Sequence, residues 1–177
     1  MLIAVHLRFT LMLTFWDAFK QLHTFSVRKA ANLAKLLSTL INSKDKNLTI
    51  GVLKRIDFSP GNTPEMVLVF LSVLMDSVFE SEASIENVFA PLRDESLDDP
   101  SSRKKKKRRR REVDDSDSEN DGDVQIKTTE KEDLSDLREN ISLFLMQYVR
   151  SGPRDIKGTR YEARLNEAID ATKGPHR

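Results

Sequence analysis

The stretch SVRKAANLAKLLSTLI, residues 26–41, decides the fold of this chain. Its apolar residues recur at steps of three and four, which places them along one face of an α-helix. They are Ala30, Leu33, Leu36, Leu37, Leu40 and Ile41. Ser26 is a plausible N-cap, because its hydroxyl can accept a hydrogen bond from a free N–H of the first turn. The stretch therefore predicts an amphipathic helix that packs this face inward.

The same periodicity continues on both sides of this helix. Upstream, three aromatic rings and a leucine that follow Thr14 share one helical face: Phe15, Trp16, Phe19 and Leu22. Downstream, apolar residues three apart predict a short helical piece over 49–56: Ile50, Leu53 and Ile56. Each segment thus offers one apolar face to a shared core.

Residues 66–75 are apolar on nearly all sides. Such a run is compatible with a buried strand or a buried helix, but its extent from Pro64 to Val78 and its start signal favour a central helix. Thr63 is the expected N-cap, and Pro64 is the expected first helical residue, where its missing N–H does no harm.

Three more helical segments complete the pattern. The first, over 84–90, should end before Pro91, because proline disfavours helical geometry in the residue before it. The other two lie after a charged segment and have apolar stripes at Leu134, Leu137, Ile141, Phe144, Leu145 and Tyr148, and at Tyr161, Leu165, Ala168 and Ile169. No segment alternates like a half-buried strand. We therefore expect an all-α fold of antiparallel helix pairs, in a bundle or a short solenoid.

Residues 94–133 have a different composition, with 14 acidic and 11 basic residues among 40 positions. So few apolar side chains cannot offset the entropy of ordering the backbone, and we expect a disordered insertion. Without it the chain keeps 18 Lys or Arg and 14 Asp or Glu, a formal charge of +4, which is not the excess of a dedicated nucleic-acid-binding domain. The predicted organisation is one helical domain in two parts, 10–93 and 134–172, with a frayed tail at 173–177.

Five stretches resemble a known module in their order along the chain. Residues 15–22 and 28–37 resemble the opening helices of an MA-three domain. LTIGVLKRIDF at 48–58, then 67–79, then LRENISLFL at 137–145 resemble the C-terminal MA-three region of nucleolar proteins that also carry a middle domain of the initiation factor 4G type. The resemblance covers nearly all of the chain outside the insertion.

This resemblance implies a HEAT-like helical repeat and a non-catalytic role in small ribosomal subunit biogenesis and pre-rRNA processing, in the nucleus and nucleolus. It also implies association with a DEAD-box RNA helicase of the initiation factor 4A class or with preribosomal proteins. The insertion is longer than the turn that the family usually has there, and the upstream middle domain has no counterpart, so a fragment or an incomplete gene model is one interpretation. A translation-initiation or splicing scaffold remains an alternative, since fold does not fix function. So does an electrostatic RNA-binding protein that acts through the insertion.

The strongest local signal is a basic run of nine residues, Arg103, Lys104, Lys105, Lys106, Lys107, Arg108, Arg109, Arg110 and Arg111. Like charges at this density repel one another, and they offer a target to the acidic groove of an importin or to phosphates. We favour nuclear import over RNA contact, and both over a merely solvated tract. No aromatic residue is interleaved for base stacking, so any RNA contact should be non-specific and sensitive to salt.

An acidic run follows at 112–123, with Ser116 and Ser118 embedded in it. Serines with acidic residues three places downstream are typical substrates of acidophilic kinases. Phosphorylation of these two candidate sites would add nearly two negative charges each and could mask the basic run. An equally good interpretation is that the acidic run only neutralises its neighbour. A calcium site is disfavoured, because a glycine-centred loop with a terminal glutamate is missing.

The inventory of reactive groups argues against an enzyme. The chain has no cysteine, which excludes disulfides, cysteine-ligated zinc and thiol catalysis and fits an intracellular compartment. His6, His23 and His176 are too far apart in sequence for a helical metal pair, and no phosphate-binding glycine loop is present. We expect no catalytic residue, metal, cofactor or small-molecule substrate.

The apolar N-terminus, residues 1–19, invites two other interpretations. It lacks the basic start and the cleavage site of a signal peptide, and it is too interrupted by polar residues to span a membrane. We expect it to pack within the helical domain, with no membrane partner. Trp16, Phe15 and Phe19 could form a hot spot for a partner, but large apolar residues at helical spacing more often pack inward.

Overall fold

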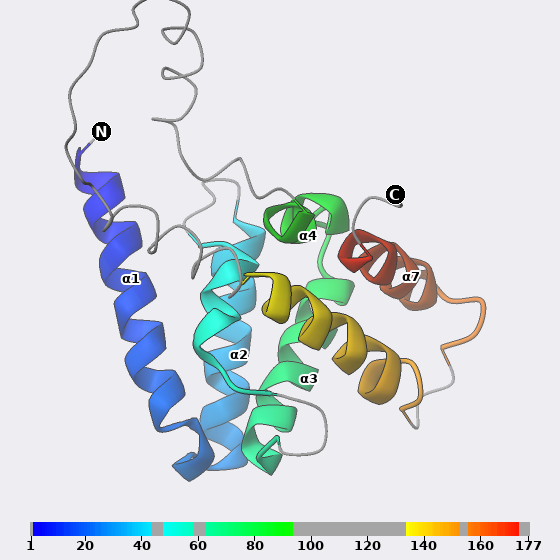
Figure 1. Cartoon of the computed structure of the whole chain (residues 1–177), viewed down its shortest axis with the longest axis horizontal. Coiled ribbons are helices and arrows are strands. Elements are labelled where there is room, and N and C mark those ends of the chain that lie inside the picture. The colour runs from blue at the N-terminus through cyan, green and yellow to red at the C-terminus, as the bar shows by residue number, and fades with distance from the viewer. Residues whose placement is uncertain (1, 44–47, 59–62, 94–133, 153–155, 174–177) are drawn as a thin grey trace, which may run out of the picture.

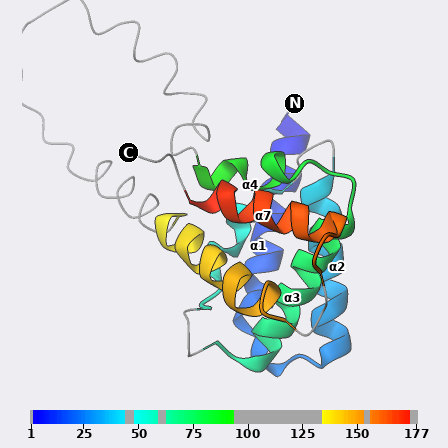
Figure 2. The same ribbon diagram turned by 90° about the vertical axis from the view of Figure 1, so that its right-hand side faces the viewer.

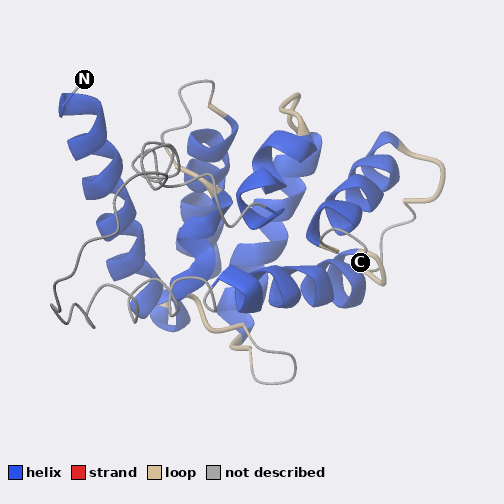
Figure 3. Cartoon of the chain, turned by 45° about the horizontal axis from the view of Figure 1, so that its top comes forward, coloured by secondary structure: helices blue, strands red, loops and turns tan. Residues whose placement is uncertain are grey.

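The computed structural model describes residues 2–43, 48–58, 63–93, 134–152 and 156–173 (Figure 1). All regular structure within these ranges is helical, and they contain no strand (Figure 3). The prediction of an all-α fold is therefore confirmed. The insertion at 94–133 and the tail beyond residue 173 lie outside the described residues.

The chain opens with an antiparallel pair, α1 (Leu2–Lys20) and α2 (Val27–Asn42), joined through the 3-10 turn η1 (Leu22–Thr24) (Figure 1). Helix α1 begins well before the aromatic cluster from which it was predicted. Thr14 lies inside the helix, where its hydroxyl donates to the carbonyl of Thr10 at 2.9 Å. Such bonds let polar residues continue a helix.

Helix α2 buries a narrower face than its apolar pattern suggested. The Ser26 hydroxyl accepts from the Lys29 N–H at 3.4 Å, as the N-cap prediction required. The buried apolar residues are Ala30, Ala34, Leu37 and Ile41. Leu36, predicted to share this stripe, keeps 54% of its surface exposed, because it lies one residue, or about 100° around the helix, from the buried Leu37.

Helix α3 (Glu65–Glu80) packs along α2 and runs in the same direction (Figure 1). The segment with the 3-10 helix η2 (Ile50–Arg55) carries the chain from the end of α2 back to the start of α3. Within α3, Phe70, Leu71, Leu74 and Met75 are fully buried, as expected for a central helix. The start differs by one residue from the prediction, because Pro64, not Thr63, is the N-cap, with extended backbone at φ −58° and ψ 145°.

Helix α4 (Ile85–Arg93) contains Pro91, so the predicted stop before this proline is wrong. Proline in a helix interior removes one backbone hydrogen bond and costs about 3 kcal/mol. Continuing for one more turn buries Leu92, which is 4% exposed, and this apolar burial offsets part of the cost.

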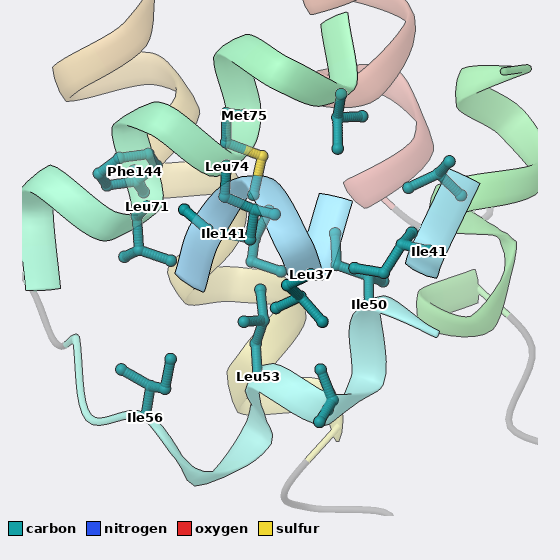
Figure 4. Packing of buried hydrophobic residues seen from close by; sticks show 14 of the residues in the cluster. Leu37, Ile41, Ile50, Leu53, Ile56, Leu71, Leu74, Met75, Ile141 and Phe144 are labelled. Carbon is teal, nitrogen blue, oxygen red and sulfur yellow. The ribbon is translucent and has the colours of Figure 1, made fainter. Parts of the chain in front are cut away.

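After the insertion, a helix over 134–144 continues into the π-helical turn η3 (Leu145–Val149), and α7 (Arg160–Thr172) follows. Helix α7 lies beside α4 and crosses α3 (Figure 2). Ile141 and Phe144 join the cluster that contains Leu37, Leu53 and Leu71 (Figure 4). Residues from both sides of the insertion thus share one hydrophobic core.

The apolar stripe predicted for the helix over 134–149 faces the core as far as Leu145, but Tyr148 does not. The Arg150 N–H donates to the carbonyl of Leu145 at 2.9 Å, a spacing of five residues. This wider turn rotates the following side chains relative to an α-helix. Tyr148 is therefore turned outward, with 42% of its surface exposed.

Candidate interaction surface

The site residues predicted from sequence lie outside the described residues. These are the basic run, Arg103–Arg111, and the two candidate phosphorylation sites, Ser116 and Ser118. Their roles in import, RNA contact and regulation therefore stay predictions. The described residues offer a different feature, centred on Trp16.

The aromatic cluster of α1 divides into two buried rings and one that reaches the surface. Phe15 and Phe19 are 3% and 7% exposed, with ring centroids 5.9 Å apart, and Phe19 meets Phe70 of α3 edge-on at 5.5 Å. The expected burial is therefore confirmed for these two. Trp16 is only half-buried, and its indole N–H donates to the carbonyl of Val52 at 3.0 Å. This bond fixes the ring between α1 and η2.

Two cations from η2 approach the Trp16 ring. The Arg55 guanidinium carbon lies 5.1 Å from the ring centroid, and the Lys54 Nζ lies 5.9 Å from it. Both distances fall within the range of a cation–π attraction, which contributes about 0.5–1 kcal/mol at an exposed site. Arg55 is exposed and Lys54 half-buried, so both charges border the solvent beside the ring.

An apolar stripe extends from Trp16 toward the start of α1. Phe9 and Leu13 precede it by seven and three residues, which places all three on one side of the helix. Phe9 is 54% exposed and Leu13 is 40% exposed. We call Phe9, Leu13, Trp16, Lys54 and Arg55 together the α1–η2 surface. It combines exposed apolar area with two positive charges at one end.

The other charges on this part of α1 pair within the helix. Lys20 Nζ lies 2.8 Å from Asp17 Oδ1, and the two side chains are 74% and 75% exposed. An exposed pair of this kind contributes little stability, because water and salt screen it. It does engage the acidic residue that follows Trp16 in the sequence, whereas Lys54 and Arg55 lie beside the Trp16 ring.

A second, smaller group of exposed apolar residues lies on the π-helical turn. Met146 is 37% exposed, and the Tyr148 ring stacks on Phe144 with centroids 5.4 Å apart. Gly152 follows this turn, and a Cβ there would come within 2.9 Å of the Tyr148 carbonyl oxygen, so a larger residue would force the backbone to shift. π-Helical turns occur often at functional sites, and the exposed Arg150 directly follows this one.

Polar contacts fasten α7 to the end of α3. The Arg164 guanidinium donates from Nη2 to the carbonyls of Val78 at 3.2 Å and Ala83 at 2.6 Å. Desolvation, aided by the nearby charge of Arg160, lowers the pKa of Arg164 from its usual value. It stays charged at neutral pH, because an arginine guanidinium is not deprotonated in proteins. This contact holds the turn between α3 and α4 in place.

The described residues contain no cluster of three or more His, Asp or Glu side chains that could hold a metal ion. His6 and His23 are both exposed on different elements. None of the helices in the described ranges has the length and apolar character needed to cross a membrane.

Sequence reasoning missed most of the α1–η2 surface. Phe9 and Leu13 lie seven and three residues before Trp16, and this helical spacing can be recognised in the sequence. The approach of Lys54 and Arg55 to Trp16 cannot be recognised there, because it depends on how η2 folds back onto α1. A comparison with family models, with curated proteins and with solved structures found no match for this chain.

Proposed function

We propose that this chain is a non-catalytic protein-interaction scaffold of the nucleolus, with a HEAT-like arrangement of helices. Its clients would be a DEAD-box RNA helicase or preribosomal proteins in small-subunit biogenesis and pre-rRNA processing. The proposal draws on the resemblance of the ordered motifs to the MA-three region and on the α1–η2 surface. That surface is the single structural observation that carries it, because exposed apolar area around a fixed tryptophan is typical of protein interfaces.

The packing of the first four elements supports a HEAT-like interpretation. Helix α1 lies against η2, and helix α2 lies against α3 (Figure 1). These contacts place α1 and η2 in one layer and α2 and α3 in the other. Layered helices of this kind, as in HEAT-like solenoids, present extended surfaces to partners.

The basic run supports the nuclear location. Nine consecutive cations at 103–111 supply the charge density that an importin recognises. They also supply a non-specific attraction for RNA, which would keep the scaffold close to its ribonucleoprotein clients. Import is the primary role in this proposal, and RNA contact is the secondary one.

Imaging and purification of a tagged full-length chain test the proposal. We expect nucleolar accumulation and co-purification with small-subunit precursors and a DEAD-box helicase. Replacing Arg103–Arg111 with serines should leave the chain in the cytoplasm. As a matched control, Lys104–Lys107 exchanged for arginines keeps every charge and should keep the location.

Two outcomes separate the alternatives. A full-length chain that stays cytoplasmic and brings down no small-subunit precursor contradicts the proposal. Co-purification with translation-initiation or splicing factors instead would assign the same helical scaffold to a different client.

A further inference from the structure

The α1–η2 surface has a geometry that suits a helix of another protein. Its apolar residues Phe9, Leu13 and Trp16 are spaced by four and three, so they form a ridge along two turns of α1. Ridges at this spacing pack into the grooves of a second helix. A partner helix would cover the exposed parts of Phe9 and Leu13, which are 54% and 40% of their surfaces.

The charges of this surface specify the chemistry of one end of the partner. Lys54 and Arg55 both lie near the Trp16 ring, at the end of the ridge that is farther from the N-terminus. The one acidic residue of α1, Asp17, is engaged by Lys20 at 2.8 Å. Carboxylates on the partner would therefore be favoured beside Arg55, whose planar guanidinium can bind a carboxylate through two parallel N–H donors.

A second copy of the chain fits this surface poorly. Parallel docking of two α1 helices would bring Lys54 and Arg55 of both copies together, and like charges repel. Antiparallel docking would place these cations near Phe9 of the other copy, where the neighbouring charged residue on α1 is Arg8. In neither arrangement does the partner copy offer an unengaged carboxylate from α1.

We propose that the α1–η2 surface docks an amphipathic helix of a partner protein, with apolar residues against Phe9, Leu13 and Trp16 and acidic residues beside Lys54 and Arg55. The docking site rests on the proposed scaffold role and specifies the class of partner. It can fail independently of that role, because it concerns binding by the purified chain and not location in the cell.

Trp16 is the chain's only tryptophan, so its fluorescence reports directly on the site. The probes are two synthetic helical peptides of about 18 residues, or roughly 27 Å, without tryptophan. They share one leucine stripe and differ only in carrying glutamates or lysines at one end. We expect the glutamate peptide to shift the Trp16 emission and to bind at least about tenfold more tightly than the lysine peptide, with the difference shrinking as salt is added.

Charge reversal and apolar substitution localise the binding. Lys54→Glu combined with Arg55→Glu should reverse the preference in favour of the lysine peptide. Phe9→Glu should weaken binding of the glutamate peptide at least about tenfold, as expected when a buried aromatic anchor is lost. Leu36→Glu is the matched control, because Leu36 is also 54% exposed but lies on α2, and it should leave binding unchanged. Circular dichroism of each variant checks that the helices are intact.

Four binding results would overturn the docking site. They are equal binding of both peptides, no binding of either, an unchanged preference after charge reversal, and a Trp16 response to single-stranded poly(U) RNA but not to the glutamate peptide. A dimer in sedimentation that Phe9→Glu dissociates would likewise overturn it, in favour of a second copy. If the peptide results hold while the tagged chain stays out of the nucleolus, the docking site stands and the proposed cellular role falls.

Discussion

Tyr161 donates its phenolic hydroxyl to Asp76 Oδ1 across 2.6 Å and thereby joins α7 to α3, although 85 residues separate the two in sequence. The same tyrosine ring meets Phe79 edge-on, with centroids 5.2 Å apart. One residue thus combines a charge-assisted hydrogen bond with apolar contact. It connects the helices after the insertion to the central helix before it.

Removing this hydroxyl should lower the stability of the whole domain. Tyr161→Phe keeps the ring contact and loses a partly buried hydrogen bond to a carboxylate, which should cost about 1–2 kcal/mol of unfolding free energy. Urea unfolding followed by far-UV circular dichroism measures it. The other tyrosine is a matched control, because Tyr148 is 42% exposed and Tyr148→Phe should change the value by less than about 0.5 kcal/mol. Equal effects of the two substitutions would contradict the role assigned to Tyr161.

The Arg164 contact should control the turn between α3 and α4. Arg164→Lys keeps the charge, but the lysine side chain is shorter and lacks the rigid guanidinium plane, so its ammonium is not held where Nη2 donates to both Val78 and Ala83. We expect a loss of about 1–2 kcal/mol and faster amide hydrogen exchange in residues 81–85 than in the unaltered chain. Arg160→Lys, at the exposed start of α7, serves as the control and should leave exchange in this turn unchanged. Unaltered exchange in Arg164→Lys would show that the turn does not depend on the guanidinium.

The elements predicted best from sequence are those with a strong period and a local start signal. Helix α2 has an apolar stripe and a serine N-cap, and both are present in the structure. The stripe at Leu165, Ala168 and Ile169 likewise becomes the buried face of α7. In these elements, propensity, capping and burial all favour the same structure, so local reasoning suffices.

The errors arise where tertiary packing outweighs a local signal. Pro91 should end a helix, but burial of Leu92 continues α4 past it. Tyr148 fits the stripe of an ideal α-helix, but the π-helical turn at 145–149 rotates it outward. Neither the offsetting burial nor the wider turn can be derived from apolar spacing alone.

The candidate surface was predictable only in part. The sequence contains the helical spacing of Phe9, Leu13 and Trp16, yet large apolar residues at helical spacing usually pack inward, and only the structure separates the buried Phe15 and Phe19 from the half-buried Trp16. The Trp16 contacts to Val52, Lys54 and Arg55 join residues that are far apart in sequence. Contacts of this kind follow from the fold and not from composition.

Phosphorylation of the acidic run should weaken any RNA binding by the basic run. Phosphate groups on Ser116 and Ser118 would add nearly two negative charges each, close to the nine cations at 103–111. We expect the phosphorylated chain to bind poly(U) RNA several-fold more weakly at low salt, as measured by fluorescence anisotropy. Kinase treatment of a Ser116→Ala and Ser118→Ala double variant should have no such effect. Undiminished RNA binding after complete phosphorylation would refute the masking interpretation.

The central claim is that helices from both sides of the insertion form one cooperative core. Ile141 lies after the insertion and is 1% exposed, whereas Trp16 lies on α1, before it. The decisive measurement is urea unfolding of Ile141→Ala, followed by Trp16 fluorescence. If the core is shared, the free energy of unfolding reported by Trp16 fluorescence should fall by about 3 kcal/mol. The Trp16 transition should also coincide with the loss of the helical circular dichroism signal. A Trp16 transition with the same urea midpoint as in the unaltered chain would contradict a shared core.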